Sequence, residues 1–519
     1  MHDSTKTCII ISVFKNSNDG TWKSEDMSFI VKVPREQLML PTSIDDYVSL
    51  DNIVRFIDAF VNKILMAKPE LLPSKGSSAE GRPSYPVDCL CKLLIYGYLN
   101  YISSSRRLEK ETKRNLEVIW LMNHLQPDHW TISDFRKENK QLIKQITIDF
   151  RKFLKDSNYI KGKSVSTDGT KIKAYASRET LSITLIDKKL EQVETEIERY
   201  LTQLNENDVT ENEQEAMLTA SKELKRQIEC LQKQVGELES QKKLLETLGR
   251  ESLAPADPDA KIMKTKDGFL PAYNVQATVD NASHFITSFE VTDYPNDFHS
   301  LEENANTLKE QLDIIPETYI ADGGYANEEQ IKSLEEQGTE CIVSFPDEPE
   351  NKKVQRDKGI RFTYDEESDC FKCSQGKTLV VIQKNCKKKN HLYNIYQCKE
   401  CSGCSVKQHC TTSETGRTIS RRVDGEWLDE YKEKSNTKEF KQKFNTRKCV
   451  VEHPFGTMKY LMGQIPILLR GKDKVQIEMD LYSTAYNLIR LKNIESVSVL
   501  LKKLAFWMPG PGFLTSSVS

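Results

Sequence analysis

Apolar residues recur every three or four positions through much of the first third of the chain. This spacing places them on one face of an α-helix. The pattern is clearest at 53–64, 90–99 and 116–120. We therefore predict an all-α N-terminal domain at 41–155, behind a segment at 1–40 that carries no clear pattern.

From about residue 270 the period of the apolar positions changes to two. Alternating runs at 273–280 and 285–291, joined by a short loop, predict a β-hairpin. Short apolar runs at 318–321 and 340–345, with a helical pattern between them, predict further strands. The expected fold class is therefore α/β with a mixed sheet.

Two insertions with distinct compositions interrupt this core. Leucine, isoleucine and valine recur at coiled-coil spacing in two runs within 180–250, which predicts a helical hairpin. This segment is acidic, since 179–250 hold 10 basic and 16 acidic residues. The second insertion is rich in cysteine, and the Pro-, Gly- and Ser-rich C-terminus reads as a disordered tail. The expected boundaries are 160–345 and 411–495 for the core, 180–250 and 366–410 for the insertions, and 508–519 for the tail.

The charge of the whole chain conceals a basic strip. Its 519 residues include 74 Lys and Arg against 77 Asp and Glu, a net charge of −3, which excludes a histone-like protein. Between Cys370 and Lys448, however, 18 basic residues stand against 8 acidic ones. Such a strip is either a solvated surface or a surface that neutralises DNA phosphates, and its place beside the site described below favours DNA.

No window of the sequence approaches the 18 apolar residues of a membrane span. We expect no membrane association and a cytoplasmic location. Thirteen cysteines, an odd number without a signal peptide, also argue against a disulfide framework.

Six of the cysteines are clustered and resemble ligands of a structural metal ion. Two Cys-x2-Cys pairs at zinc-ribbon spacing predict Zn²⁺ at Cys370, Cys373, Cys398 and Cys401. Which four thiolates bind stays open, because Cys404 and Cys410 can replace the second pair and His409 is a further candidate.

Three carboxylates have settings that suit a divalent cation. Asp168 and Asp322 each end a predicted strand, and Glu452 lies on a predicted helix after the last strand. Strand ends meet at one edge of a sheet, and carboxylate oxygens are the ligands that Mg²⁺ or Mn²⁺ prefers. The competing interpretation is that both Asp-Gly pairs simply form turns.

The sequence around these carboxylates resembles the bacterial insertion-sequence DDE transposases. The matching words are STDGTKIKAYAS, DPDAKIMKTKDGFLPAYNVQATVD, YIADGGYA and RKCVVEHPFGTMKYLMG, and the likeness spans about residues 40–500, with PDHWTISDFR in the helical domain. The resemblance implies a ribonuclease-H-like core with Asp168, Asp322 and Glu452 as a Mg²⁺- or Mn²⁺-binding catalytic triad. It also implies a small zinc-stapled segment before the Glu452 helix.

The same resemblance assigns basic residues to DNA. The family places a basic residue where Lys459 stands, two helical turns from Glu452. An upstream motif, Tyr-x2-Arg-x3-Glu, departs here, because Lys448 holds the Arg position and Arg447 precedes it by one. Both are candidate DNA contacts, with a solvated helix start as the alternative.

Several polar residues near the carboxylates fit more than one role. Asn274, Gln276 and Asp280 share one strand face, and they either orient ligands or form a solvated outer face. Asp297 follows the hairpin, and we interpret it as a turn residue rather than a site residue.

The sequence as a whole predicts a DDE transposase. It would cleave DNA strands at transposon ends with a metal-activated water and join the freed 3′-hydroxyl to target DNA. We expect it to act as a homodimer or higher oligomer on DNA, associated with the nucleoid. The alternatives are an inactive or domesticated DNA-binding relative and a metal-dependent nuclease without strand transfer.

Overall fold

The computed structural model describes residues 43–72, 84–177, 180–209, 216–345, 360–388, 391–423, 425–462 and 467–510. Two compact units share the chain, Met1–Ser49 and Leu50–Ser519. Within the first unit the described part contains one short 3-10 helix, η2 (Ile44–Tyr47). The predicted patternless segment 1–40 and residues 511–519 of the predicted tail lie outside the described residues.

The second unit begins with an all-α module, as the apolar spacing predicts. Its helices are α1 (Ile53–Ala67), η3 (Pro69–Leu71), α2 (Val87–Leu99), α3 (Ser105–Arg114), α4 (Leu116–Leu121), α5 (His129–Glu138) and α6 (Lys140–Asp156). An aromatic cluster holds α1 against α6, since Phe56 and Phe60 contact Phe150 and Phe153. Trp507, after the C-terminal helix α16 (Val497–Phe506), stacks on Phe60 and closes the cluster.

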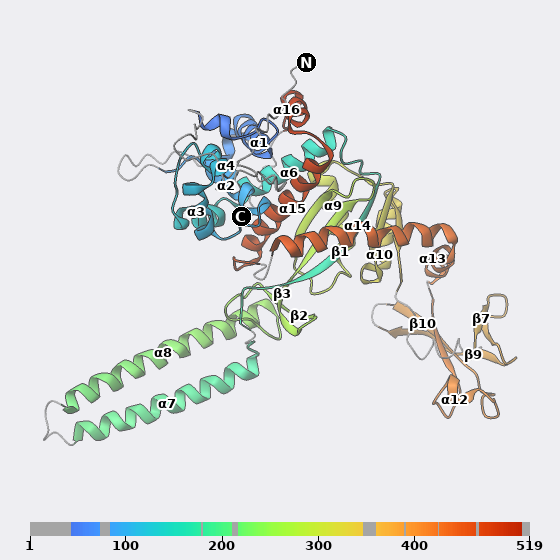
Figure 1. Ribbon diagram of the computed structural model, residues 1–519. Coiled ribbons are helices and arrows are strands. Elements are labelled where there is room, and N and C mark those ends of the chain that lie inside the picture. Colours follow the sequence, from blue (N-terminus) through green and yellow to red (C-terminus); the bar gives the residue numbers. More distant parts are fainter. Residues whose placement is uncertain are drawn as a thin grey trace, which may run out of the picture. The chain divides into compact units, whose positions relative to one another are not determined.

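A mixed six-stranded sheet forms the core (Figure 1). Its strands are β1 (Ser164–Lys173), β2 (Lys261–Thr265), β3 (Gly268–Asp280), β4 (Ile286–Thr292), β5 (Thr318–Ala321) and β6 (Glu340–Val343). The order is β2-β3-β1-β5-β6, with β4 also paired to β3. β1, β5 and β6 run parallel, while β3 is antiparallel to β1, β2 and β4.

Helices that precede and follow the cysteine-rich insertion cover this sheet. They are α9 (Ser300–Leu312), η4 (Gly323–Tyr325), α10 (Glu328–Glu336), α13 (Glu426–Asn436), α14 (Lys438–Met462) and α15 (Lys472–Ile494). α15 packs on α2, α6 and β4 and so joins the helical module to the sheet. Gln476 and Asn487 of α15 accept hydrogen bonds from the backbone of β4, at 2.7 and 2.9 Å. These bonds satisfy backbone groups of a strand at the edge of the sheet.

The predicted helical hairpin is present as α7 (Ile183–Val209) and α8 (Ala216–Leu248), which run side by side (Figure 1). At its base a small apolar cluster contains Leu181, Ile186, Leu245 and Leu253. Leu181 and Leu253 also form an isolated antiparallel bridge, which closes the hairpin where it leaves the core.

The cysteine-rich insertion is a second, five-stranded sheet with a short helix. It consists of β7 (Phe362–Asp365), β8 (Cys370–Cys373), β9 (Thr378–Lys388), β10 (His391–Gln397), β11 (Thr418–Arg422) and α12 (Lys407–Cys410). The strands pair antiparallel in the order β11-β10-β9-β8-β7. The sheet therefore extends beyond the predicted 366–410 at both ends. None of the described helices of the chain is long and apolar enough to span a membrane.

Candidate active site

Asp168 and Asp322 come from neighbouring parallel strands. Val165 of β1 pairs with Tyr319 of β5, and Ser166 pairs with Ile320. Extended by two residues, this register would bring Asp168 opposite Asp322, although the pairing itself ends at Ser166 and Ile320. Two carboxylates that are 154 positions apart in sequence thus meet at one edge of the core.

Asp168 does not end its strand, contrary to the sequence prediction. β1 continues to Lys173 because it stays paired with β3, where Asp168 lies opposite Ala277. What ends near Asp168 is only the pairing with β5, whose last pair is Ser166 with Ile320. Asp322 then leaves the sheet, and its Oδ1 accepts a hydrogen bond of 2.8 Å from the backbone of Gly324.

A guanidinium from α14 lies against both carboxylates. Nη1 of Arg447 is 3.3 Å from Oδ2 of Asp168, and Nη2 is 3.8 Å from Oδ2 of Asp322. The Arg447 side chain is only 11% exposed. Its buried Nε and Nη1 have no hydrogen-bond partner within the described residues. Arg447 therefore compensates the charge of the two carboxylates while keeping donor capacity unused.

The pKa of Asp168 is shifted first by burial and then by the charged groups around it. Burial raises the pKa of Asp168 to about 6; Arg447 opposes this rise, whereas the carboxylates of Asp322 and Asp297 add to it. Burial is also the main reason that the pKa of the Tyr325 hydroxyl lies well above its usual value, with the same three carboxylates contributing. Such a site favours the binding of a cation.

Asp297 belongs to this group and also to a turn, since its carbonyl accepts a hydrogen bond of 3.0 Å from the backbone of Ser300. The turn interpretation is therefore correct but incomplete. Its Oδ1 accepts hydrogen bonds from Nδ2 of Asn274 at 2.9 Å and from Nε2 of Gln276 at 2.6 Å. Asn274 and Gln276 are each 1% exposed, which excludes the solvated outer face left open by the sequence. Oε1 of Gln276 accepts in turn from Asn304 and from the hydroxyl of Tyr325. Asp280 instead binds the backbone of Gly162 and Ser283, away from this group.

The remaining predicted residues of α14 lie elsewhere on that helix. Lys448 and Glu452 are exposed, and Glu452 makes no ion pair or hydrogen bond within the described residues. Lys459 lies in α14, but its side chain is outside the described part of the chain. The structure thus brings Asp168, Asp322 and Arg447 together and does not bring Glu452 to them.

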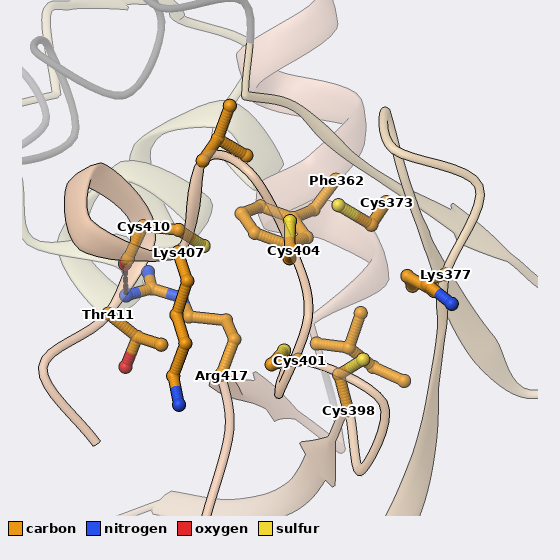
Figure 2. A pocket seen from close by; sticks show the side chains of 12 residues that line it. Phe362, Cys373, Lys377, Cys398, Cys401, Cys404, Lys407, Cys410, Thr411 and Arg417 are labelled. Atoms are coloured by element: carbon orange, nitrogen blue, oxygen red, sulfur yellow. Dashed lines mark hydrogen bonds between the residues drawn. The ribbon is translucent and has the colours of Figure 1, made fainter. Parts of the chain in front are cut away.

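Five thiols gather at a pocket in the cysteine-rich sheet. Figure 2 shows Cys373, Cys398, Cys401, Cys404 and Cys410 around it. Lys377, Lys407 and Arg417 line the same pocket and add positive charge beside the thiols. Cys370, one of the four predicted ligands, is not among the lining residues.

The strand β8 explains why Cys370 is absent from the pocket. Successive side chains of a strand point to opposite faces, so two residues three positions apart face opposite ways. Cys370 and Cys373 both lie in β8, opposite Asp365 and Phe362 of β7. The zinc-ribbon spacing predicts that Cys370 and Cys373 bind one ion, whereas within a strand their side chains point to opposite faces.

Neither the carboxylates at the sheet edge nor the thiols at the pocket are arranged as a complete set of metal ligands. Across the described ranges, no three His, Cys, Asp or Glu side chains lie where they could together hold a metal ion. The donor types nonetheless fit two different cations, because the core edge offers hard carboxylate oxygens and the second sheet offers soft thiols.

Two family models match parts of the chain. A model described as "Transposase DDE domain" matches residues 372–492, from β8 to the end of α15, and so includes Arg447 and Glu452. A model described as "Transposase domain (DUF772)" matches residues 42–138, which hold α1 to α5. No curated protein and no solved structure matches the chain significantly. The two models match in the same chain order as the motifs quoted above from the helical domain and from the segment around Glu452. The chain belongs to the DDE transposases of insertion-sequence elements.

Proposed function

We propose that this transposase cleaves DNA strands at transposon ends and transfers the freed 3′-hydroxyls to target DNA. The observation that carries the proposal is the meeting of Asp168 and Asp322 at one sheet edge, with Arg447 against both. Arg447 comes from the segment that matches the DDE domain, so the family match and the carboxylate pair concern one site.

Asp168 and Asp322 are the proposed ligands of Mg²⁺ or Mn²⁺ in a ribonuclease-H-like core, with Glu452 as the third member of the triad. Two such ions would stabilise the attacking and leaving oxygens of an in-line displacement at phosphorus. The protein's own groups have a separate task. A phosphate beside the carboxylates would meet the unused donors of Arg447, whose planar fork suits phosphate oxygens.

The cysteine-rich sheet is the proposed site of a structural Zn²⁺. Cys373, Cys398 and Cys401 would hold it, with Cys404 or Cys410 as the fourth ligand. Five thiols at one pocket support this assignment, and a tetrahedral thiolate site would fix the short sheet that carries them.

DNA contacts would involve Lys448 and Lys459 of α14 and the basic strip at 370–448. Lys448 is exposed on the same helix that carries Arg447 to the carboxylates. Because a transposon has two ends, we propose that the protein acts as a homodimer or higher oligomer on DNA, in the nucleoid.

The test is cleavage of a labelled transposon end by the full chain with Mg²⁺, with joined products scored separately. Asp322→Asn keeps the size of the side chain and removes its charge, so we expect cleavage to fall by at least about 100-fold, as for loss of a main electrostatic group. Asp267→Asn, in the exposed turn between β2 and β3, is the matched control and should cleave normally.

Each outcome has one meaning. Undiminished cleavage by Asp322→Asn would overturn the carboxylate assignment. Cleavage without joined products would identify a nuclease that does not transfer strands. DNA binding without cleavage by the wild type would identify an inactive relative.

A further inference from the structure

Asp297 approaches the carboxylate pair from a different part of the chain. It lies in the segment between β4 and α9, whereas Asp168 is in β1 and Asp322 follows β5. Two glycines show how close it comes. A Cβ at position 169 would clash with Oδ1 of Asp297, and a Cβ at position 324 would lie 3.4 Å from its Oδ2.

These glycines follow the two aspartates directly, as Asp168-Gly169 and Asp322-Gly323-Gly324. Neither Gly169 nor Gly324 has a positive φ, so left-handed backbone does not explain them. The close approach of the Asp297 side chain explains why glycine stands at both positions. At position 169 a side chain would also come within 2.6 Å of Nε2 of Gln276. The absence of a side chain there leaves room for a third carboxylate.

The two oxygens of Asp297 have different environments. Oδ1 accepts hydrogen bonds from both Asn274 and Gln276, which are buried and are themselves held in place. Gln276 is fixed by Asn304 at 3.2 Å, and Asn304 also bonds to Thr167 at 3.1 Å, next to Asp168. Oδ2 has no hydrogen-bond donor within the described residues and lies on the side of Gly324.

Two buried amides that hold one oxygen of a carboxylate leave the other oxygen oriented and free. This is the arrangement in which an outer shell fixes a metal-ligating carboxylate. The exposed Glu452, by contrast, has no described contact with either aspartate.

We propose that Asp297 is a ligand of the divalent cation held by Asp168 and Asp322 in the DNA-free protein. The three described side chains do not lie at ligating positions, so the ion would draw them together as it binds. The inference rests on the proposed function, because it assumes that this pair binds a cation. Asn274 and Gln276 are then positioning residues that act through Asp297, and Gly169 provides the space that Asp297 needs.

The experiment measures Mn²⁺ binding to the full chain without DNA, by titration calorimetry and by the spectrum of the bound ion. Asp297→Asn keeps an oxygen for the two amides and removes the charge of the free oxygen. We expect its Kd for Mn²⁺ to rise about 10- to 100-fold. Asp293→Asn, in the same segment but exposed and paired with Lys472, is the matched control and should bind as the wild type does.

A second variant covers the case in which Asp297→Asn fails to fold. Gly169→Ala leaves all carboxylates intact but displaces Asp297, so it should also weaken Mn²⁺ binding. Combining it with Asp297→Asn should add little, because both remove the same interaction. Gly236→Ala, in α8 with open space around it, is its control.

The outcomes separate the two proposals. If the wild type and all variants bind no Mn²⁺, the cation site of the proposed function is wrong, and this inference falls with it. If the wild type and Glu452→Gln bind while Asp297→Asn binds equally well, only the role of Asp297 is refuted. Loss of binding in both Asp297→Asn and Gly169→Ala, with both controls unchanged, supports it.

Discussion

Glu478 is a buried carboxylate at the junction between the helical module and the core. It lies on α15 and is 0% exposed. Its Oε1 accepts hydrogen bonds from the backbone of Leu468 at 2.9 Å and of Leu469 at 2.6 Å. Burial raises the pKa of Glu478 to about 7, although Arg136 and the two backbone donors lower it. Its protonation should therefore affect the stability of the fold near neutral pH.

The magnitude follows from the difference between the folded and unfolded chain. The ordinary pKa of this group is 4.5, and about 1.4 kcal/mol corresponds to each pH unit of difference, so the effect is about 3 kcal/mol. Below pH 4.5 the carboxyl is protonated in both states and has no effect. Between pH 4.5 and 7 only the folded state keeps the proton, so stability falls as the pH rises. Above pH 7 the full cost of the buried charge is present.

Glu478→Gln should remove this dependence, since glutamine resembles the protonated carboxyl and keeps an oxygen for the two backbone donors. The variant should match the wild type at pH 4.5 and exceed its free energy of unfolding by up to about 3 kcal/mol at pH 8. Urea unfolding followed by tryptophan fluorescence measures the difference, with Glu310→Gln, exposed on α9, as the control. A constant difference between the variant and the wild type from pH 4.5 to 8 would refute the reasoning.

Two further predictions concern the cysteine-rich sheet and the exposed face of α14. Cys398→Ser should lose the zinc that the purified wild type carries, measured by metal analysis, whereas Cys230→Ser on the exposed side of α8 should retain it; zinc-free wild type would contradict the site. Lys448→Ala should weaken DNA binding and flatten the slope of log Kd against log salt by about 0.9, the value for one phosphate contact. Fluorescence anisotropy gives the slope, and Lys188→Ala on α7 should leave it unchanged; an equal slope for Lys448→Ala would refute the contact.

The pairing of Asp168 with Asp322 could be predicted because it depends on local signals. Asp322 follows a short apolar run and Asp168 follows a strand-forming stretch around Val165, and neighbouring parallel strands bring the two positions together. The period of two across 273–280 likewise predicted the strand that pairs with β1. Where the period of the apolar positions decides the secondary structure, the sequence was sufficient to predict the strands.

Asp297 could not be predicted in this way, because no periodic pattern links it to Asp168, which is 129 positions away in sequence. The one signal in the sequence was the glycine after each aspartate, which leaves space for a neighbouring side chain. Both aspartates are followed by glycine, and a turn was the simpler reading of each pair. Only the folded structure shows that the glycine at position 169 makes room for a side chain from another part of the chain.

Helix α14 shows why residue spacing alone did not assign its basic residues. Successive helical residues are rotated by about 100°, so Lys448 and Glu452 are about 40° apart around the axis. Arg447 and Glu452 are about 140° apart. The face with Arg447 lies against Asp168 and Asp322, and the face with Glu452 is exposed.

Glu452 could therefore join the aspartates only if α14 rotated or bent. Pro454 lies inside the helix two residues later and lacks the N–H that would bond to the carbonyl of Val450, which lowers the cost of a bend there. A rotation that brought Glu452 inward would also carry Arg447 away from the carboxylates and remove their compensating charge. A cation between Asp168, Asp322 and Asp297 would replace that charge, so metal binding and the arrival of Glu452 are expected to favour each other.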